Sequence, residues 1–144
     1  MSEILTSPRP SRFGRALGFR VLSSGSAVPD RVVTNADLGH LGCDPEWILS
    51  RSGIQERRHV DPGVATSDLA VKAAERALAA CGDVRDQVDL LVLGTFTPDT
   101  SLPSTACIVQ EKLGLNAPAM DVTAACAGFA YGLVTAGQFL ATGS

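Results

Sequence analysis

One segment near the C-terminal end of the chain restricts the fold more than any other. An apolar stretch at residues 117–122 leads to Cys126, and residues 127–141 then contain no charge and no proline. This pattern predicts a buried strand followed by a helix that needs apolar cover on all sides. Glycines at 128, 132 and 137 each weaken that helix by about 1 kcal/mol relative to alanine. We therefore expect another part of the fold to pack very close to its backbone.

The rest of the chain alternates predicted strands and helices. Apolar runs predict strands at residues 19–24, 88–95 and 119–122, and a helix is expected to start at 34–38. Further helices are predicted at residues 44–51, 66–81 and 103–113, the second of them from an apolar stripe at helical spacing. Such alternation predicts an α/β architecture of stacked layers with a mainly parallel sheet.

Capping residues mark the ends of two of these helices. Asp44 is a typical N-cap, Pro45 suits the first helical position, and Gly53 can end the helix. Gly114 is expected to stop the helix at residues 103–113. Few elements remain to cover the final apolar helix, so we expect a partner chain or a longer protein to cover it.

Cys126 has two interpretations on the residues alone. A lone cysteine in apolar surroundings is usually a small buried hydrophobe. In the first turn of the predicted helix, however, free amide N–H groups and the positive end of the helix dipole favour a thiolate, which is a nucleophile. Cys81 and Cys107 are interpreted as packing residues in helices, and Cys43 as a loop residue.

The composition argues against several classes of protein. No two cysteines have CxxC spacing, and His40 and His59 do not cluster with cysteines, so no metal site is expected. Four thiols without a disulfide pattern and without a secretory signal fit the reducing cytoplasm. No stretch approaches the roughly 20 apolar residues of a membrane span, so no membrane partner is expected.

The charge of the chain is unevenly distributed. Residues 1–20 hold four arginines and one glutamate, which leaves 8 basic and 14 acidic groups in the remainder. That acidic excess argues against nucleic acid as the main partner. The basic first residues also contain prolines and serines, and we expect a flexible N-terminal tail over residues 1–18, with organelle targeting as a minor alternative.

Several sequence blocks occur in the order and spacing of one known family. They are GSAVP at 25–29 with VTNADL at 33–38, EWI at 46–48 with RSGI at 51–54 and ER at 56–57, LPS at 102–104 with the following helix, and DVTAACAGF at 121–129. Through these blocks, residues 19–144 resemble the N-terminal half of a β-ketoacyl-acyl-carrier-protein synthase III, a thiolase-fold condensing enzyme. The resemblance implies half of a layered αβαβα architecture.

The resemblance also implies a reaction, used to start fatty acid or polyketide chains. Cys126 would take an acyl group from coenzyme A as a thioester, and its own amide N–H could contribute to an oxyanion hole. Malonyl-acyl carrier protein would then lose carbon dioxide, and its carbanion would attack that thioester. Acyl-coenzyme A is thus an expected substrate, with no permanently bound cofactor. Acyl carrier protein and a second copy of the chain are the expected partners.

Three further residues gain expected roles from the resemblance. Trp47 would stack on the adenine of coenzyme A, and Arg51, four residues later on the same helix face, would meet its phosphates. The alternatives are packing for Trp47, and a solvated face or an ion pair with Glu56 or Asp61 for Arg51. Leu102 would shape the acyl pocket across a dimer.

The role of Arg57 stays undecided between the same alternatives. Cys43 and Gln55 depart from the family pattern, where a hydroxyl residue and an arginine are common, so some nucleotide contacts are expected to be lost.

The family's decarboxylation residues, a histidine and an asparagine, come from a second half that matches nothing in this chain. We therefore expect 144 residues alone to be inactive in condensation. A truncation, an incomplete gene prediction or an enzyme split over two chains would each explain the length. Two alternatives remain open. One is a starter-unit acyltransferase of the same fold, and the other is a non-catalytic half that dimerises with a partner.

Overall fold

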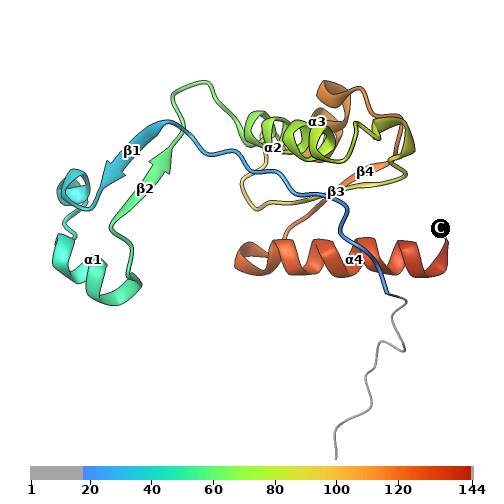
Figure 1. The fold of residues 1–144 in the computed structure, drawn as a ribbon. Helices are drawn as coiled ribbons and strands as arrows, with labels where there is room; N and C mark the ends of the chain where they lie inside the picture. Colours follow the sequence, from blue (N-terminus) through green and yellow to red (C-terminus); the bar gives the residue numbers. More distant parts are fainter. Residues whose placement is uncertain (1–17, 144) are drawn as a thin grey trace, which may run out of the picture.

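The computed structural model describes residues 18–143, which form a body and a projecting arm (Figure 1). The predicted tail, residues 1–18, lies outside this range except for Gly18. We call residues 30–59 the arm and residues 66–143 the body. The arm contains β1 (Arg31–Thr34), the 3-10 helix η1 (Ala36–Leu41), α1 (Pro45–Ser52) and β2 (Glu56–His59). The body contains α2 (Thr66–Ala80), η2 (Arg85–Gln87), β3 (Leu91–Gly94), α3 (Thr105–Leu113), β4 (Ala119–Val122), η3 (Ala125–Ala127) and α4 (Gly128–Thr142).

The body has three layers. Strands β3 and β4 pair in parallel, from Leu91 opposite Ala119 to Gly94 opposite Val122, with α3 as the crossover between them. Helices α2 and α3 lie on one side of this pair, and α4 packs on the other side (Figure 1). The predicted α/β layering and the parallel pairing are confirmed for this part of the chain.

The core of the body lies between α2, α3 and the strands. Val109, Leu113 and Leu115 are buried, and the apolar stripe predicted for α2 packs against them through Ala70, Val71 and Ala74. Burying a side chain such as Leu113 contributes about 1.5–3 kcal/mol. Lys112 of α3 adds a polar link to α2, because its Nζ lies 2.7 Å from both the hydroxyl of Ser67 and the carboxylate of Asp68.

The arm is built on an antiparallel pair, which the expectation of a mainly parallel sheet did not include. Strands β1 and β2 pair from Arg31 opposite His59 to Thr34 opposite Glu56. Helix α1 has the predicted caps: the Asp44 side chain accepts a hydrogen bond from the amide of Trp47, and Gly53 ends the helix at a φ of 71°. These local signals predict both ends of α1 to within a residue or two of where the structure has them.

The strand predicted at residues 19–24 is wrong for the described residues. Its backbone makes no ladder hydrogen bond, because none of the strands within residues 18–143 runs beside it as a partner. The segment instead crosses the body: Gly25 packs against the backbone of α2, and the ring of Phe19 lies beside Gly137 of α4. The strand predicted at 88–95 is also shorter, since the four residues of β4 limit the length of the pairing.

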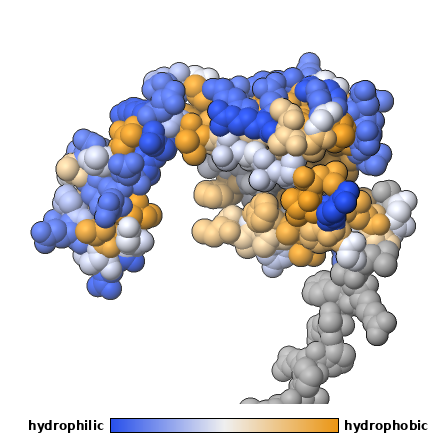
Figure 2. All heavy atoms as spheres, viewed as in Figure 1, coloured by the Kyte–Doolittle hydropathy of each residue, from blue (hydrophilic) through white to orange (hydrophobic). Residues whose placement is uncertain are grey.

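Helix α4 packs as closely as its glycines predict. A Cβ added to Gly94 of β3 would lie 2.8 Å from the carbonyl carbon of Gly128, so the helix and strand backbones touch. No element between residues 18 and 143 covers the outer face of α4, as expected from the few elements that remain to do so, and cover by a partner chain or a longer protein stays a prediction. Figure 2 shows hydrophobic side chains gathered over α4, where Phe129 is 80% exposed.

Candidate active site

Cys126 lies at the junction that the sequence predicts, with one difference in local structure. It belongs to the 3-10 turn η3 between β4 and α4, and so precedes the first turn of α4. Its side chain is exposed. The hydrogen bonds of this turn are donated by the amides of Ala127 and Gly128, which reach the carbonyl oxygens of Ala124 and Ala125. The amide of Cys126 is not among these donors.

The residue before Cys126 has an unusual backbone. Ala125 has a φ of +43°, in the left-handed region that non-glycine residues rarely adopt. Such conformations cost about 1–3 kcal/mol and cluster at functional sites, where the surrounding fold holds them. Here the parallel strand β4 and the close contact between Gly94 and Gly128 fix the two ends of the turn. The turn therefore presents the thiol at the surface of the body.

The start of α4 differs from the starts of the other α-helices among the described residues. Asp44 caps α1, and the Asp99 side chain accepts from the amide of Ser67 at the start of α2. Ser104 caps α3, whose first amides also donate to Asp121. No side chain within residues 18–143 caps α4. The amides that follow Gly128 in this first turn, close to Cys126, therefore have no side-chain acceptor within that range and are suited to an anion or a carbonyl oxygen.

Asp121 connects the junction to the rest of the body. Its two carboxylate oxygens accept hydrogen bonds from the amides of Thr105 (2.9 Å) and Ala106 (2.7 Å) at the start of α3. Asp121 belongs to β4, five residues before Cys126, so this pair of bonds fixes β4 relative to α3. Asp121 stands in the motif block at residues 121–129, whose pattern alone does not indicate this role.

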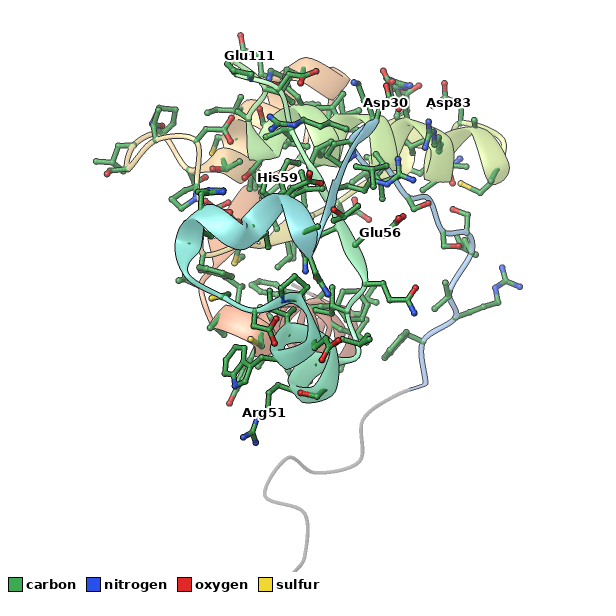
Figure 3. The ribbon with its side chains drawn as sticks, turned by 90° about the vertical axis from the view of Figure 1, so that its left-hand side faces the viewer. Asp30, Arg51, Glu56, His59, Asp83 and Glu111 are labelled. Atoms are coloured by element: carbon green, nitrogen blue, oxygen red, sulfur yellow. The ribbon has the colours of Figure 1, made fainter. Side chains whose placement is uncertain are left out.

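Trp47 and Arg51 lie on α1, at the end of the arm. Trp47 is 55% exposed among the described residues, and its role stays a prediction. Arg51 is exposed, and Figure 3 shows its side chain pointing away from the ribbon. The ion pairs within residues 18–143 join Arg85 to Asp83 and Lys112 to Asp68, so the proposed pairing of Arg51 with Glu56 or Asp61 is not formed.

Arg57, whose role the sequence left undecided, is part of the scaffold of the arm. It is half-buried, and its guanidinium donates to the side-chain oxygen of Asn35 at 2.6 Å and to the carbonyl of Val33 at 3.2 Å. The suggested ion pair of Arg57 with Glu56 or Asp61 is likewise absent from the described residues. Sequence reasoning assigned no role to Asn35, although it stands in one of the motif blocks.

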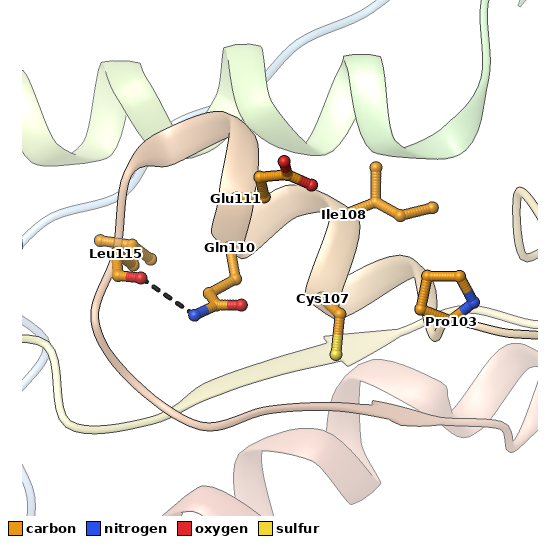
Figure 4. A pocket seen from close by; sticks show the side chains of 6 residues that line it. All are labelled: Pro103, Cys107, Ile108, Gln110, Glu111 and Leu115. Atoms are coloured by element: carbon orange, nitrogen blue, oxygen red, sulfur yellow. Dashed lines mark hydrogen bonds between the residues drawn. The ribbon is translucent and has the colours of Figure 1, made fainter.

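Leu102 stands on the loop before α3 and is 86% exposed. The described residues do not gather Leu102, Trp47 and Cys126 into one pocket. A hollow of about 510 Å³ lies instead beside α3, lined by Pro103, Cys107, Ile108, Gln110, Glu111 and Leu115 (Figure 4). A second, of about 830 Å³, lies between the start of the strands and the end of α4. The predicted acyl pocket beside Leu102 therefore stays a prediction.

Residues 18–143 contain neither a metal-binding cluster nor a membrane-spanning helix. No group of three or more His, Cys, Asp or Glu side chains in this range could hold a metal ion. In the same range, none of the helices has the length and hydrophobicity needed to cross a bilayer.

Comparisons of the sequence identify relatives over most of the chain. No protein-family model matches. A β-ketoacyl-[acyl-carrier-protein] synthase III from Rhodopirellula baltica is 53% identical over 131 residues, which make up 91% of this chain and 38% of that protein. One from Geobacillus kaustophilus is 47% identical over 130 residues, 89% of this chain and 42% of that protein. The chain thus spans about two-fifths of the length of the curated relatives it matches.

Solved structures agree with this sequence similarity. The β-ketoacyl-[acyl carrier protein] synthase III of Thermus thermophilus superposes with a TM-score of 0.80 at 42% identity, over 85% of this chain and 39% of the other. A priming β-ketosynthase from the R1128 polyketide biosynthetic pathway gives a TM-score of 0.79 at 34% identity, over 86% of this chain and 38% of the other. Over the compared residues, the chain is therefore homologous to β-ketoacyl-acyl-carrier-protein synthase III and has the thiolase-like fold of these condensing enzymes.

Proposed function

We propose that this chain forms part of an acyl-coenzyme A-dependent condensing enzyme of the synthase III type, with Cys126 as the acylated nucleophile. The observation that carries the proposal is the geometry of the junction. An exposed thiol follows a residue with positive φ and stands beside the one α-helix start of residues 18–143 that no side chain caps. A cysteine that served only as packing would need neither the exposure nor the strained turn.

The first step is transfer of an acyl group to Cys126. The thiolate attacks the thioester carbonyl of acyl-coenzyme A, and the carbonyl oxygen gains negative charge in the tetrahedral intermediate. The amide of Cys126, free of the hydrogen bonds of its own turn, is suited to donate to that oxygen. When the intermediate collapses, the bond to the sulfur of coenzyme A breaks. Coenzyme A leaves as a thiolate and takes up the proton that Cys126 lost, and the acyl group stays on the enzyme.

The second step would condense this acyl group with a malonyl unit. Malonyl-acyl carrier protein loses carbon dioxide, and the resulting carbanion attacks the carbonyl carbon of the Cys126 thioester. The bond to the sulfur of Cys126 then breaks, so that the cysteine leaves as a thiolate, which takes up a proton from solvent, and the product is a β-ketoacyl-carrier protein. By the resemblance, the histidine and asparagine that promote decarboxylation belong to a second half of the enzyme. We accordingly propose that residues 19–144 are the N-terminal half of such an enzyme.

The arm supplies the proposed contact with coenzyme A. Trp47 presents an exposed indole, on which adenine can stack for about 1–3 kcal/mol. Arg51, one turn further along α1, is exposed and takes part in no ion pair of the described residues, so its guanidinium is available to the phosphates. The exposed side chain of Leu102 supports a role at a dimer interface, where it would help to shape the acyl pocket.

Product formation by the native gene product tests the condensation. We expect it to release carbon dioxide from malonyl-acyl carrier protein in the presence of acetyl-coenzyme A, and to form acetoacetyl-carrier protein. Cys126→Ala should form no condensation product, whereas Cys107→Ala, which changes a half-buried cysteine of α3, should retain activity. Acyl transfer to the carrier without carbon dioxide release would instead identify a starter-unit acyltransferase. Product formation by Cys126→Ala would refute the role of this cysteine.

A further inference from the structure

The arm has very little apolar core. Among the described residues 30–59, Val33 is the one buried hydrophobic residue. Asn35, at 8% exposure, is buried beside it although its side chain is polar. Because apolar burial contributes so little here, the shape of the arm depends on hydrogen bonds made by buried polar groups.

The Asn35 side chain holds both ends of α1. Its amide nitrogen donates to the carbonyl oxygen of Ile54, just after the helix, at 2.8 Å, and approaches that of Pro45, the first helical residue, at 3.4 Å. Its backbone amide donates to the carbonyl of Gln55 at 3.2 Å. One residue at the end of β1 thereby fixes where α1 begins and where the chain leaves it.

Arg57 in turn fixes the orientation of the Asn35 side chain. One guanidinium nitrogen donates to the side-chain oxygen of Asn35 at 2.6 Å, and another donates to the carbonyl of Val33 at 3.2 Å. A guanidinium can only donate, so the oxygen of Asn35 must face Arg57, and its NH₂ group must face the two carbonyls that flank α1. The forked guanidinium also clamps β1, a function that the single ammonium group of lysine cannot reproduce.

We propose that Asn35 and Arg57 are positioning residues for coenzyme A binding. They set the orientation of α1, and with it the exposed face that carries Trp47 and Arg51. Neither residue is expected to touch the ligand itself. This inference rests on the proposed function, since it assumes that coenzyme A meets α1.

The test compares two acetyl donors on the native gene product. Acetyl-coenzyme A carries the nucleotide that α1 is expected to bind, and S-acetyl-N-acetylcysteamine lacks it. Arg57→Lys keeps the charge and removes the fork. We expect its KM for acetyl-coenzyme A to rise about tenfold, the effect of losing one hydrogen bond to a charged group. Its kcat, and its rate of Cys126 acetylation by the nucleotide-free donor, should stay near those of the unaltered protein.

The neighbouring arginine provides a matched control. Arg58 is exposed and donates to the carbonyl oxygen of Asp30 at 3.0 Å, with no link to α1. Arg58→Lys should leave the KM for acetyl-coenzyme A unchanged. If Arg57→Lys does not fold, Arg57→Gln and Asn35→Ser serve in its place, with the same two donors.

The outcomes separate this inference from the proposed function. An equal loss of rate with both donors would show that Arg57 only maintains the fold, and would overturn the positioning role. An unchanged KM for acetyl-coenzyme A in both Arg57→Lys and Asn35→Ser would overturn it as well. If the unaltered protein is acetylated by neither donor, the proposed function itself fails, and the positioning role fails with it.

Discussion

The contact between β3 and α4 gives a prediction with a defined sign and size. Gly94→Ala would place a Cβ 2.8 Å from the carbonyl carbon and 2.9 Å from the carbonyl oxygen of Gly128. Carbon atoms at their optimal separation stand about 3.5–4.0 Å apart, so the new methyl group overlaps backbone that cannot rotate away. Strand and helix must separate, and overpacking of this kind costs about 1–3 kcal/mol.

Gly132, on the α4 side of the same contact, provides the control, with the opposite expected sign. A Cβ on Gly132 would meet the side chain of Val92 at 3.5 Å, which is an ordinary contact. Gly132→Ala also removes the helix penalty of glycine, so it should stabilise the protein by up to about 1 kcal/mol. The two variants add the same methyl group to the two sides of one interface.

Urea unfolding of both variants measures how far each substitution changes the free energy of unfolding. We expect the free energy of unfolding to fall by about 1–3 kcal/mol for Gly94→Ala. The same substitution should also slow acylation of Cys126, because the turn that carries the thiol leads directly into α4 at Gly128. Equal stability of Gly94→Ala and the unaltered protein would refute the close packing of β3 on α4, and with it the account of how the turn is held.

Three further predictions concern the site and its support. Trp47→Ala should raise the KM for acetyl-coenzyme A about tenfold through lost stacking, and an unchanged KM in steady-state kinetics would return Trp47 to a packing role. Asp121→Ala should lower the free energy of unfolding by about 1–3 kcal/mol, because two amides at the start of α3 lose their acceptor; an unchanged urea midpoint would contradict this. The pKa of Asp68 is held below its usual value, first by the amide of Ala65 and then by Lys112. The unfolded state thus binds this proton more readily, so stability contributed above about pH 4 should be lost as the pH falls through the lowered pKa. Urea midpoints across that range, compared with those of Lys112→Met, measure this loss, and identical pH profiles for the two proteins would contradict it.

Elements whose signals lie within a few residues could be predicted from the sequence. Asp44 and Gly53 mark the ends of α1, Gly114 ends α3, and residues 119–122 form the predicted strand. Each of these signals acts through hydrogen bonds or backbone angles over a turn or less. The prediction of a strand at residues 19–24 was wrong because a strand also needs a neighbouring strand to pair with, and an apolar run does not specify one.

The position of the candidate site could likewise be predicted from local sequence signals, but its detailed geometry could not. The strand, the small residues around Cys126 and the uncharged helix together indicated a raised thiol, and the structure gives it an exposed position. The pattern could not show that the thiol lies in a 3-10 turn, since that depends on the backbone of Ala125. The link between Asn35 and Arg57 joins residues 22 positions apart, and no local spacing rule reveals such a contact.

The central claim is that Cys126 carries the acyl group, and intact-protein mass spectrometry tests it most directly. We predict that the native gene product gains the mass of one acetyl group on exposure to acetyl-coenzyme A. Peptide mapping should place that group on Cys126, and Cys126→Ala should gain none while Cys107→Ala still does. A folded protein that gains no mass, or an adduct that persists in Cys126→Ala, would contradict the account.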